Sequence, residues 1–189
     1  MTITTEATSR STHEVELRRL YLGRFAFALL WAASLILAGG SSGPALTLLL
    51  VVYPLVDAAA VLWQVRNRHN GQGARIAQWI NVLVSVVVAV ALGWASTVSI
   101  ATVLVVWGIW AVGSGLPQLV TAVRNRHRGG QVPQMLSGGI SILAGGGFLA
   151  QGVQGASEIG GVAGYAVLGG IFFLLSGIRL GLFARRTAP

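Results

Sequence analysis

The sequence has no cysteine and no lysine, and charged residues of every kind are scarce. Without cysteine the chain can form no disulfide, thiol nucleophile or thiolate metal site, and cysteine usage says nothing about its compartment. Only 10% of the 189 residues are charged, against about a quarter in soluble domains. In contrast, 54% of the residues are hydrophobic and the mean hydropathy is +0.73. These values exclude a soluble globular protein.

Long apolar runs take the place of charge. Six such runs occur, each near the length that a helix needs to cross about 30 Å of hydrocarbon. The predicted helices cover about 20–38, 45–65, 76–93, 99–123, 134–151 and 160–183, with a short uncharged turn near 95–97. The predicted fold class is therefore all-α, a polytopic membrane protein with six transmembrane helices whose partner is the lipid bilayer.

Basic segments recur at the ends of alternate apolar runs. Arg66-Asn67-Arg68-His69 is repeated unchanged at 124–127, and Arg185-Arg186 closes the last run in the same way. The period of about 57–58 residues predicts three helical hairpins, 20–65, 76–123 and 134–183, as parallel repeats about an axis along the membrane normal. The transmembrane domain covers 17–186, between a disordered tail at 1–16 and a short tail at 187–189.

Charge is distributed asymmetrically across the predicted membrane. All 13 Arg residues fall on one side of the six helices, whereas Glu158 is the one charge on the other side. The positive-inside rule then places both termini in the cytoplasm. The net charge of +8 does not indicate nucleic-acid binding, because the Arg residues lie at helix ends and no aromatic-rich basic patch accompanies them.

Small and polar residues follow one face of each odd-numbered predicted helix at four-residue spacing. Such residues let helices approach closely in lipid, where burial of apolar surface gives little attraction. The odd-numbered helices are therefore predicted to form the crowded interior. The residues expected at helix contacts are Ala28, Ala32, Ser85, Ala89, Gly93, Ser137, Ser141, Gly145, Gly160, Gly164, Gly177 and Gly181.

Asp57 is the one acidic residue inside an apolar run, about 13 Å from the basic boundary at 1.5 Å per residue. An ionised carboxylate there is costly unless it is paired, protonated or hydrated. Arg24, Asn81 and Arg179 lie at comparable depth and complete a predicted polar cluster. Asp57 either pins helices together through a buried ion pair or takes up protons or a polar ligand. We favour the pin, because a neighbouring Arg stabilises the ionised carboxylate.

Other residues suggest no catalytic site. His69 and His127 occupy matching loop positions, but two loop histidines without a carboxylate make a weak metal or pH-sensing signal. Gly113-Ser114-Gly115 invites comparison with intramembrane serine proteases, which need a histidine on a facing helix, and every His here lies outside the spans. No metal, cofactor or phosphate-binding motif occurs. The chain is predicted not to be an enzyme.

The layout resembles the HdeD-like acid-resistance membrane proteins over about residues 18–186. The segments that carry the resemblance are Gly43-Pro44-Ala45-Leu46-Thr47, Tyr53-Pro54-Leu55-Val56-Asp57-Ala58, Ser114-Gly115 and Leu175-Ser176-Gly177-Ile178. The resemblance implies a six-helix protein of the bacterial inner membrane, linked to survival at low pH, and it supplies no catalytic residues.

These observations lead to three hypotheses. The first is a non-enzymatic, HdeD-like membrane protein linked to acid or envelope stress resistance. The second is a small transporter or channel whose polar pocket surrounds Asp57. The third is a membrane scaffold or assembly partner, acting as a homo-oligomer or with another membrane protein, which the glycine-rich helices over 134–151 and 160–183 suggest.

Overall fold

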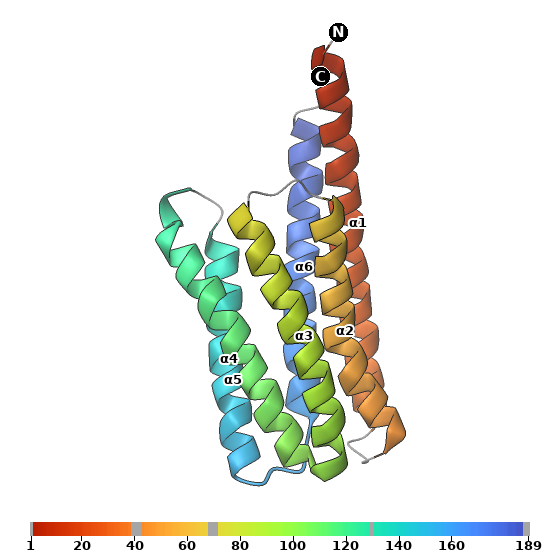
Figure 1. The fold of residues 1–189 in the computed structure, drawn as a ribbon, viewed down its shortest axis with the longest axis vertical. Helices are drawn as coiled ribbons and strands as arrows, with labels where there is room; N and C mark the ends of the chain where they lie inside the picture. Colours follow the sequence, from red (N-terminus) through yellow and green to blue (C-terminus); the bar gives the residue numbers. More distant parts are fainter. Residues whose placement is uncertain (1, 39–42, 68–71, 129–130, 187–189) are drawn as a thin grey trace.

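The computed structural model describes residues 2–38, 43–67, 72–128 and 131–186. The chain forms α1 (Thr2–Leu37), α2 (Pro44–Asn67), α3 (Gln72–Val98), α4 (Ile100–Arg124), the short 3-10 helix η1 (Arg126–Arg128), α5 (Val132–Val153) and α6 (Gly160–Arg186) (Figure 1). Each long helix contains 22–25 residues apolar enough to cross a membrane. The predicted all-α class with six membrane-spanning helices is thus confirmed, and these ranges contain no strand.

Two local predictions differ from the structure. The disordered tail predicted at 1–16 is helical from Thr2 onward, because extending an existing helix costs far less than nucleating one. The turn predicted near 95–97 is also helical, and Ser99 alone separates α3 from α4. Ser99 Oγ accepts a hydrogen bond from the Thr102 N–H at 3.1 Å and caps α4. Residues 39–42, between the first two predicted helices, and His69 lie outside the described residues.

The most extensive helix contacts do not follow the predicted hairpins. α2 packs on α3, α4 on α5, and α1 on α6, whereas α1 touches α2, and α5 touches α6, only slightly. The basic loops join the first two of these pairs, and α1 begins and α6 ends at the same end of the bundle (Figure 1). We call this end of the bundle the basic end. The predicted hairpins therefore describe the order of the helices along the chain, whereas the helices that pack most closely are α1 with α6, α2 with α3, and α4 with α5.

A seam of glycines joins α4 to α5. Gly108 and Gly115 on α4 face Gly145 and Gly138 on α5, and Gly152, seven residues beyond Gly145, faces Ala101 and Val105. A Cβ atom on Gly145 would lie 2.8 Å from the Gly108 carbonyl oxygen, which is closer than real contacts allow. The two backbones therefore touch directly, as expected where helices in lipid attract one another through close fit.

Most residues expected at helix contacts do face the interior. Ala28, Ala32, Ser85, Ala89, Ser141, Gly145 and Gly177 are buried, and Gly93, Ser137 and Gly181 are partly buried. Gly160 and Gly164 are exposed, because α6 turns Gly170 and Gly177 toward α1 instead. The odd-numbered helices are also not alone inside, since Leu46, Leu50 and Trp107 from α2 and α4 are fully buried.

The half of the bundle away from the basic end is packed solid. Leu35, Leu92 and Phe148, which occupy equivalent positions in the three repeats, are all buried there. Side chains of the even-numbered helices, among them Val103 and Val162, complete the same cluster. This apolar half closes the bundle on that side.

We expect Gly145→Ala to lower the free energy of unfolding by about 1–3 kcal/mol, because the new methyl group overpacks the α4–α5 seam. Gly146→Ala is the matched control, since nothing lies within 4 Å of its added Cβ. The control should be neutral or stabilise the helix by up to about 1 kcal/mol. Denaturant unfolding in mixed micelles measures both, and equal losses in the two variants would contradict the seam.

Candidate functional site

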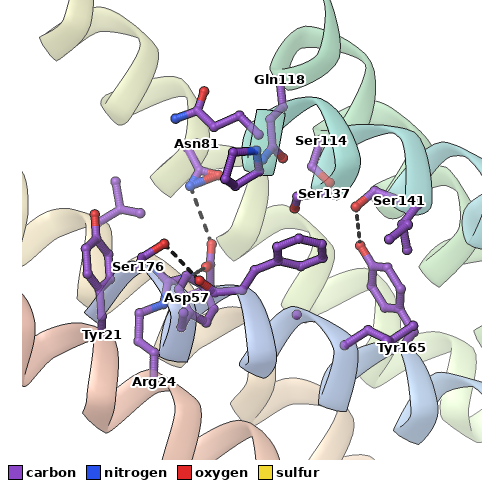
Figure 2. Close-up of a pocket in the computed structure, with 18 of the residues that line it drawn as sticks. Tyr21, Arg24, Asp57, Asn81, Ser114, Gln118, Ser137, Ser141, Tyr165 and Ser176 are labelled. Atoms are coloured by element: carbon purple, nitrogen blue, oxygen red, sulfur yellow. Dashed lines mark hydrogen bonds and ion pairs between the residues drawn. The ribbon is translucent and has the colours of Figure 1, made fainter. Parts of the chain in front are cut away.

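A cavity of about 430 Å³ lies in the half of the bundle nearer the basic end. All six long helices contribute to its wall, and most of the lining residues lie within the membrane-spanning stretches. Figure 2 labels ten of the polar side chains around it, namely Tyr21, Arg24, Asp57, Asn81, Ser114, Gln118, Ser137, Ser141, Tyr165 and Ser176. Polar groups converge here on a space that apolar side chains do not fill.

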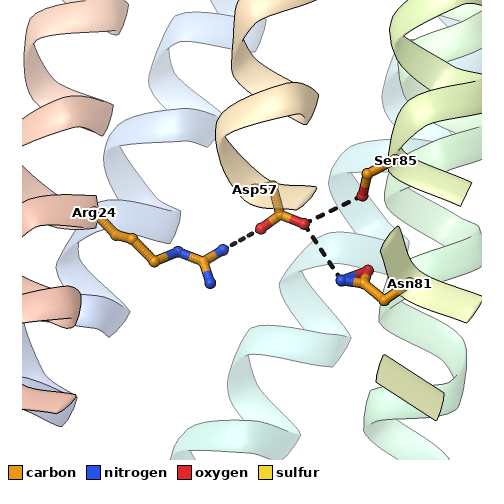
Figure 3. Close-up of polar contacts among 4 residues, drawn as sticks. All are labelled: Arg24, Asp57, Asn81 and Ser85. Carbon is orange, nitrogen blue, oxygen red and sulfur yellow. Dashed lines mark hydrogen bonds and ion pairs between the residues drawn. The ribbon is translucent and has the colours of Figure 1, made fainter. Parts of the chain in front are cut away.

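An ion pair forms one wall of the cavity. Arg24 Nη2 of α1 donates to Asp57 Oδ1 of α2, while Asn81 Nδ2 and Ser85 Oγ of α3 donate to Asp57 Oδ2 at 3.4 and 3.3 Å (Figure 3). The side chains of Arg24 and Asp57 are 14% and 19% exposed. The Arg24 guanidinium also lies 4.0 Å from the ring centroid of Phe173 on α6. The pair therefore connects four helices.

The predicted polar cluster is assembled in part. Asp57, Arg24 and Asn81 meet as described, and Ser85, which the sequence suggested only as a packing residue, joins them. Arg179 is exposed and does not line the cavity. It lies near the end of α6, where a long Arg side chain is able to reach the membrane surface. The structure thus removes Arg179 from the predicted cluster.

Equivalent positions of the three repeats converge on the cavity. The polar residues that begin the stripes of the odd-numbered helices, Arg24, Asn81 and Ser137, all line it. So do the matching residues of the even-numbered helices, Asp57, Ser114 and Ser176. Four residues earlier, each even-numbered helix supplies an aromatic side chain, namely Tyr53, Trp110 and Phe172. Alignment of the repeats could have revealed these layers from the sequence.

The tyrosines and glutamines of the cavity were not predicted. All three tyrosines of the chain, Tyr21, Tyr53 and Tyr165, line it, and the Tyr165 and Ser141 hydroxyls are 2.9 Å apart. Gln118 and Gln134 line it near the basic end. Their position could have indicated the cavity, because a polar side chain within an apolar span is costly unless it has a hydrogen-bonding partner or a ligand.

Aromatic rings separate the cavity from the solid half of the bundle. Trp31 and Tyr53 lie 4.5 Å apart between ring centroids, and Trp107 stacks on Trp31 at 5.5 Å. Trp31 Nε1 donates to the Leu49 carbonyl oxygen at 2.6 Å, which fixes its ring. Gln134, in the first turn of α5 at the basic end, lines the cavity and is exposed. The cavity is therefore closed toward the apolar half and accessible toward the basic end.

Among the described residues that line the cavity there is no histidine. His127 lies in η1 at the basic end, outside the membrane-spanning stretches, where a loop position was predicted, and His69 lies outside the described residues. Within the described part of the chain, no three His, Asp or Glu side chains gather as metal ligands do. The chemistry available at the cavity is hydrogen bonding, aromatic contact and the one ion pair.

Comparisons with protein-family models, with characterised proteins and with solved structures found no match for this chain. The resemblance to the HdeD-like proteins accordingly stays a prediction based on the segments that carry it.

We expect Asp57→Ala to lower the free energy of unfolding by about 1–3 kcal/mol, because it leaves the Arg24 charge unpaired among the helices. The loss is smaller than for a fully buried pair, since both side chains are partly exposed and solvent screens their charges. Arg24→Ala combined with Asp57→Ala should cost less than the sum of the single changes. A double-mutant cycle measures this coupling, and strictly additive losses would show that the Arg24–Asp57 pair does not stabilise the helix packing.

Proposed function

We propose that this chain is a non-enzymatic integral membrane protein that binds a small molecule in the cavity between its six helices. The observation that carries the proposal is the convergence of polar side chains from every helix on one accessible space inside the membrane-spanning region. Polar residues at such depth are rare and mark ligand sites or pathways. A volume of about 430 Å³ suits a small-molecule site, for which about 300–1,000 Å³ is usual.

The packing favours a carrier over an open channel. A channel needs a continuous polar path, whereas the apolar cluster around Leu35, Leu92 and Trp107 closes one half of the bundle. Access from one side at a time is what a carrier requires. The slight contacts between α5 and α6, and between α1 and α2, favour movement of the tightly packed pairs as units. We therefore propose that the bound molecule enters from the basic end and crosses when the pairs rearrange.

The physiological setting is proposed from the sequence. The HdeD-like segments support a protein of the bacterial inner membrane that contributes to acid or envelope stress resistance. The concentration of Arg at one end supports cytoplasmic placement of that end and of both termini. Cytoplasmic access to the cavity follows from these two proposals together.

Binding is tested by ligand-induced stabilisation of the protein in lipid nanodiscs. Small polar and aromatic molecules are screened for those that raise the unfolding temperature, since a ligand at a hundred times its Kd stabilises by about 2.7 kcal/mol. Ser137→Trp should abolish the shift by filling the cavity. Ser34→Trp is the matched control, because Ser34 is exposed and its hydroxyl bonds only its own helix. A shift that survives Ser137→Trp would place the ligand elsewhere.

The stress role predicts that cells lacking the protein survive acid shock less well than cells that have it. Complementation with the wild-type chain should restore survival, and Ser137→Trp should not if the cavity is used. Protein levels of each variant are measured alongside viable counts. Unchanged survival on deletion would contradict the stress role and leave the binding proposal standing.

A further inference from the structure

The charges at the cavity cancel. Among the described residues that line it, Arg24 and Asp57 are the two with charged side chains, and they contact each other directly. The cavity as a whole is therefore polar but electrically neutral. This balance bears on which molecules can enter.

Both charged groups are already occupied. The Asp57 carboxylate accepts hydrogen bonds from Arg24, Asn81 and Ser85. The Arg24 guanidinium is held by Asp57 and lies over the Phe173 ring. An ionic ligand would have to leave water without a free counter-charge, or separate the pair, and either change is costly in a medium of low dielectric.

The remaining walls suit a flat molecule. Tyr21 and Phe173 stack at 6.2 Å with their planes 17° apart, and Tyr53, Trp110 and Phe172 add further rings. Aromatic side chains favour planar apolar partners that stack offset or edge to face.

Two serine hydroxyls of the cavity have their hydrogens engaged and can accept hydrogen bonds. Ser114 Oγ donates to the Ala111 carbonyl oxygen at 3.2 Å, and Ser176 Oγ donates to that of Phe172 at 2.8 Å. A hydroxyl has one hydrogen, so each oxygen retains its lone pairs as acceptors for a ligand. A molecule with N–H or O–H groups therefore matches this wall.

We infer that the cavity selects an uncharged, planar molecule that donates hydrogen bonds, and that the Arg24–Asp57 pair excludes charged analogues. The inference rests on the proposed function, because it names the ligand class of the same cavity. It makes Arg24 and Asp57 specificity-determining residues as well as a structural link between α1 and α2.

Three indole derivatives with the same ring test the charge selection. Indole-3-ethanol is neutral, tryptamine is a cation and indole-3-acetate is an anion at neutral pH. Each is measured by equilibrium dialysis against the full chain in nanodiscs, with empty nanodiscs as the correction for partition into lipid. The neutral compound should bind at least about tenfold more tightly than either ion, because an uncompensated charge costs more than 1.4 kcal/mol.

Variants of the pair separate charge selection from structural support. Asp57→Asn leaves Arg24 uncompensated and should shift relative affinity toward indole-3-acetate by at least about tenfold. Arg24→Gln leaves Asp57 uncompensated and should shift relative affinity toward tryptamine. This variant tests the same role of the pair if Asp57→Asn does not fold. Arg24→Gln combined with Asp57→Asn is the matched control, since it keeps size and neutrality and should again prefer indole-3-ethanol.

The outcomes distinguish the inference from the proposed function. Tighter binding of either ion by the wild-type chain, or single variants with unchanged preference, would overturn the role of the pair. Failure of all three compounds to bind would overturn the ligand class. The proposed function is supported in each case if another molecule stabilises the wild-type chain but does not stabilise the Ser137→Trp variant. It is overturned if no screened molecule stabilises the wild-type chain.

Discussion

Close fit between helix surfaces is the constraint on which this structure depends, because lipid gives apolar helices little reason to associate otherwise. The α4–α5 glycine seam is its clearest expression, with backbone atoms of Gly108 and Gly145 in direct approach. Close fit is concentrated within the pairs α1–α6, α2–α3 and α4–α5, and contact between pairs is smaller. A space between the pairs at the basic end is the consequence, while large apolar side chains fill the other half.

Polar groups facing that space must satisfy one another or bind something from outside. Asp57 shows the first solution, because three donors from α1 and α3 surround its carboxylate. Ser114 and Ser176 suit the second, since their hydroxyl hydrogens are bonded within their own helices and their oxygens keep acceptor capacity at the cavity. One ion pair thus stabilises the arrangement of α1, α2 and α3 and also sets the electrical character of the space beside it.

The three repeats have the same helix arrangement but carry different polar side chains at equivalent positions. Equivalent positions hold Asp57, Ser114 and Ser176 on one set of helices, and Arg24, Asn81 and Ser137 on the other. A single repeat therefore carries both charges, and the other two supply neutral polar groups. A cavity built in this way has a wall with an ion pair and a wall of hydroxyls, so that a bound molecule has a defined orientation even though the helices are arranged regularly.

The sequence by itself determined the six apolar helices and the periodic basic ends, because span length and charge placement are local properties of the chain. It also indicated that Asp57 needs Arg24 and Asn81, since a charge at that depth requires partners. Only the tertiary structure decided the helix pairs, the cavity and its tyrosines, the exposure of Arg179 and the outward position of Gly160 and Gly164. The reason is rotation about the helix axis. A helix that is apolar all round has no pattern that fixes which face meets a neighbour, so the close fit of particular glycines, serines and rings makes that choice.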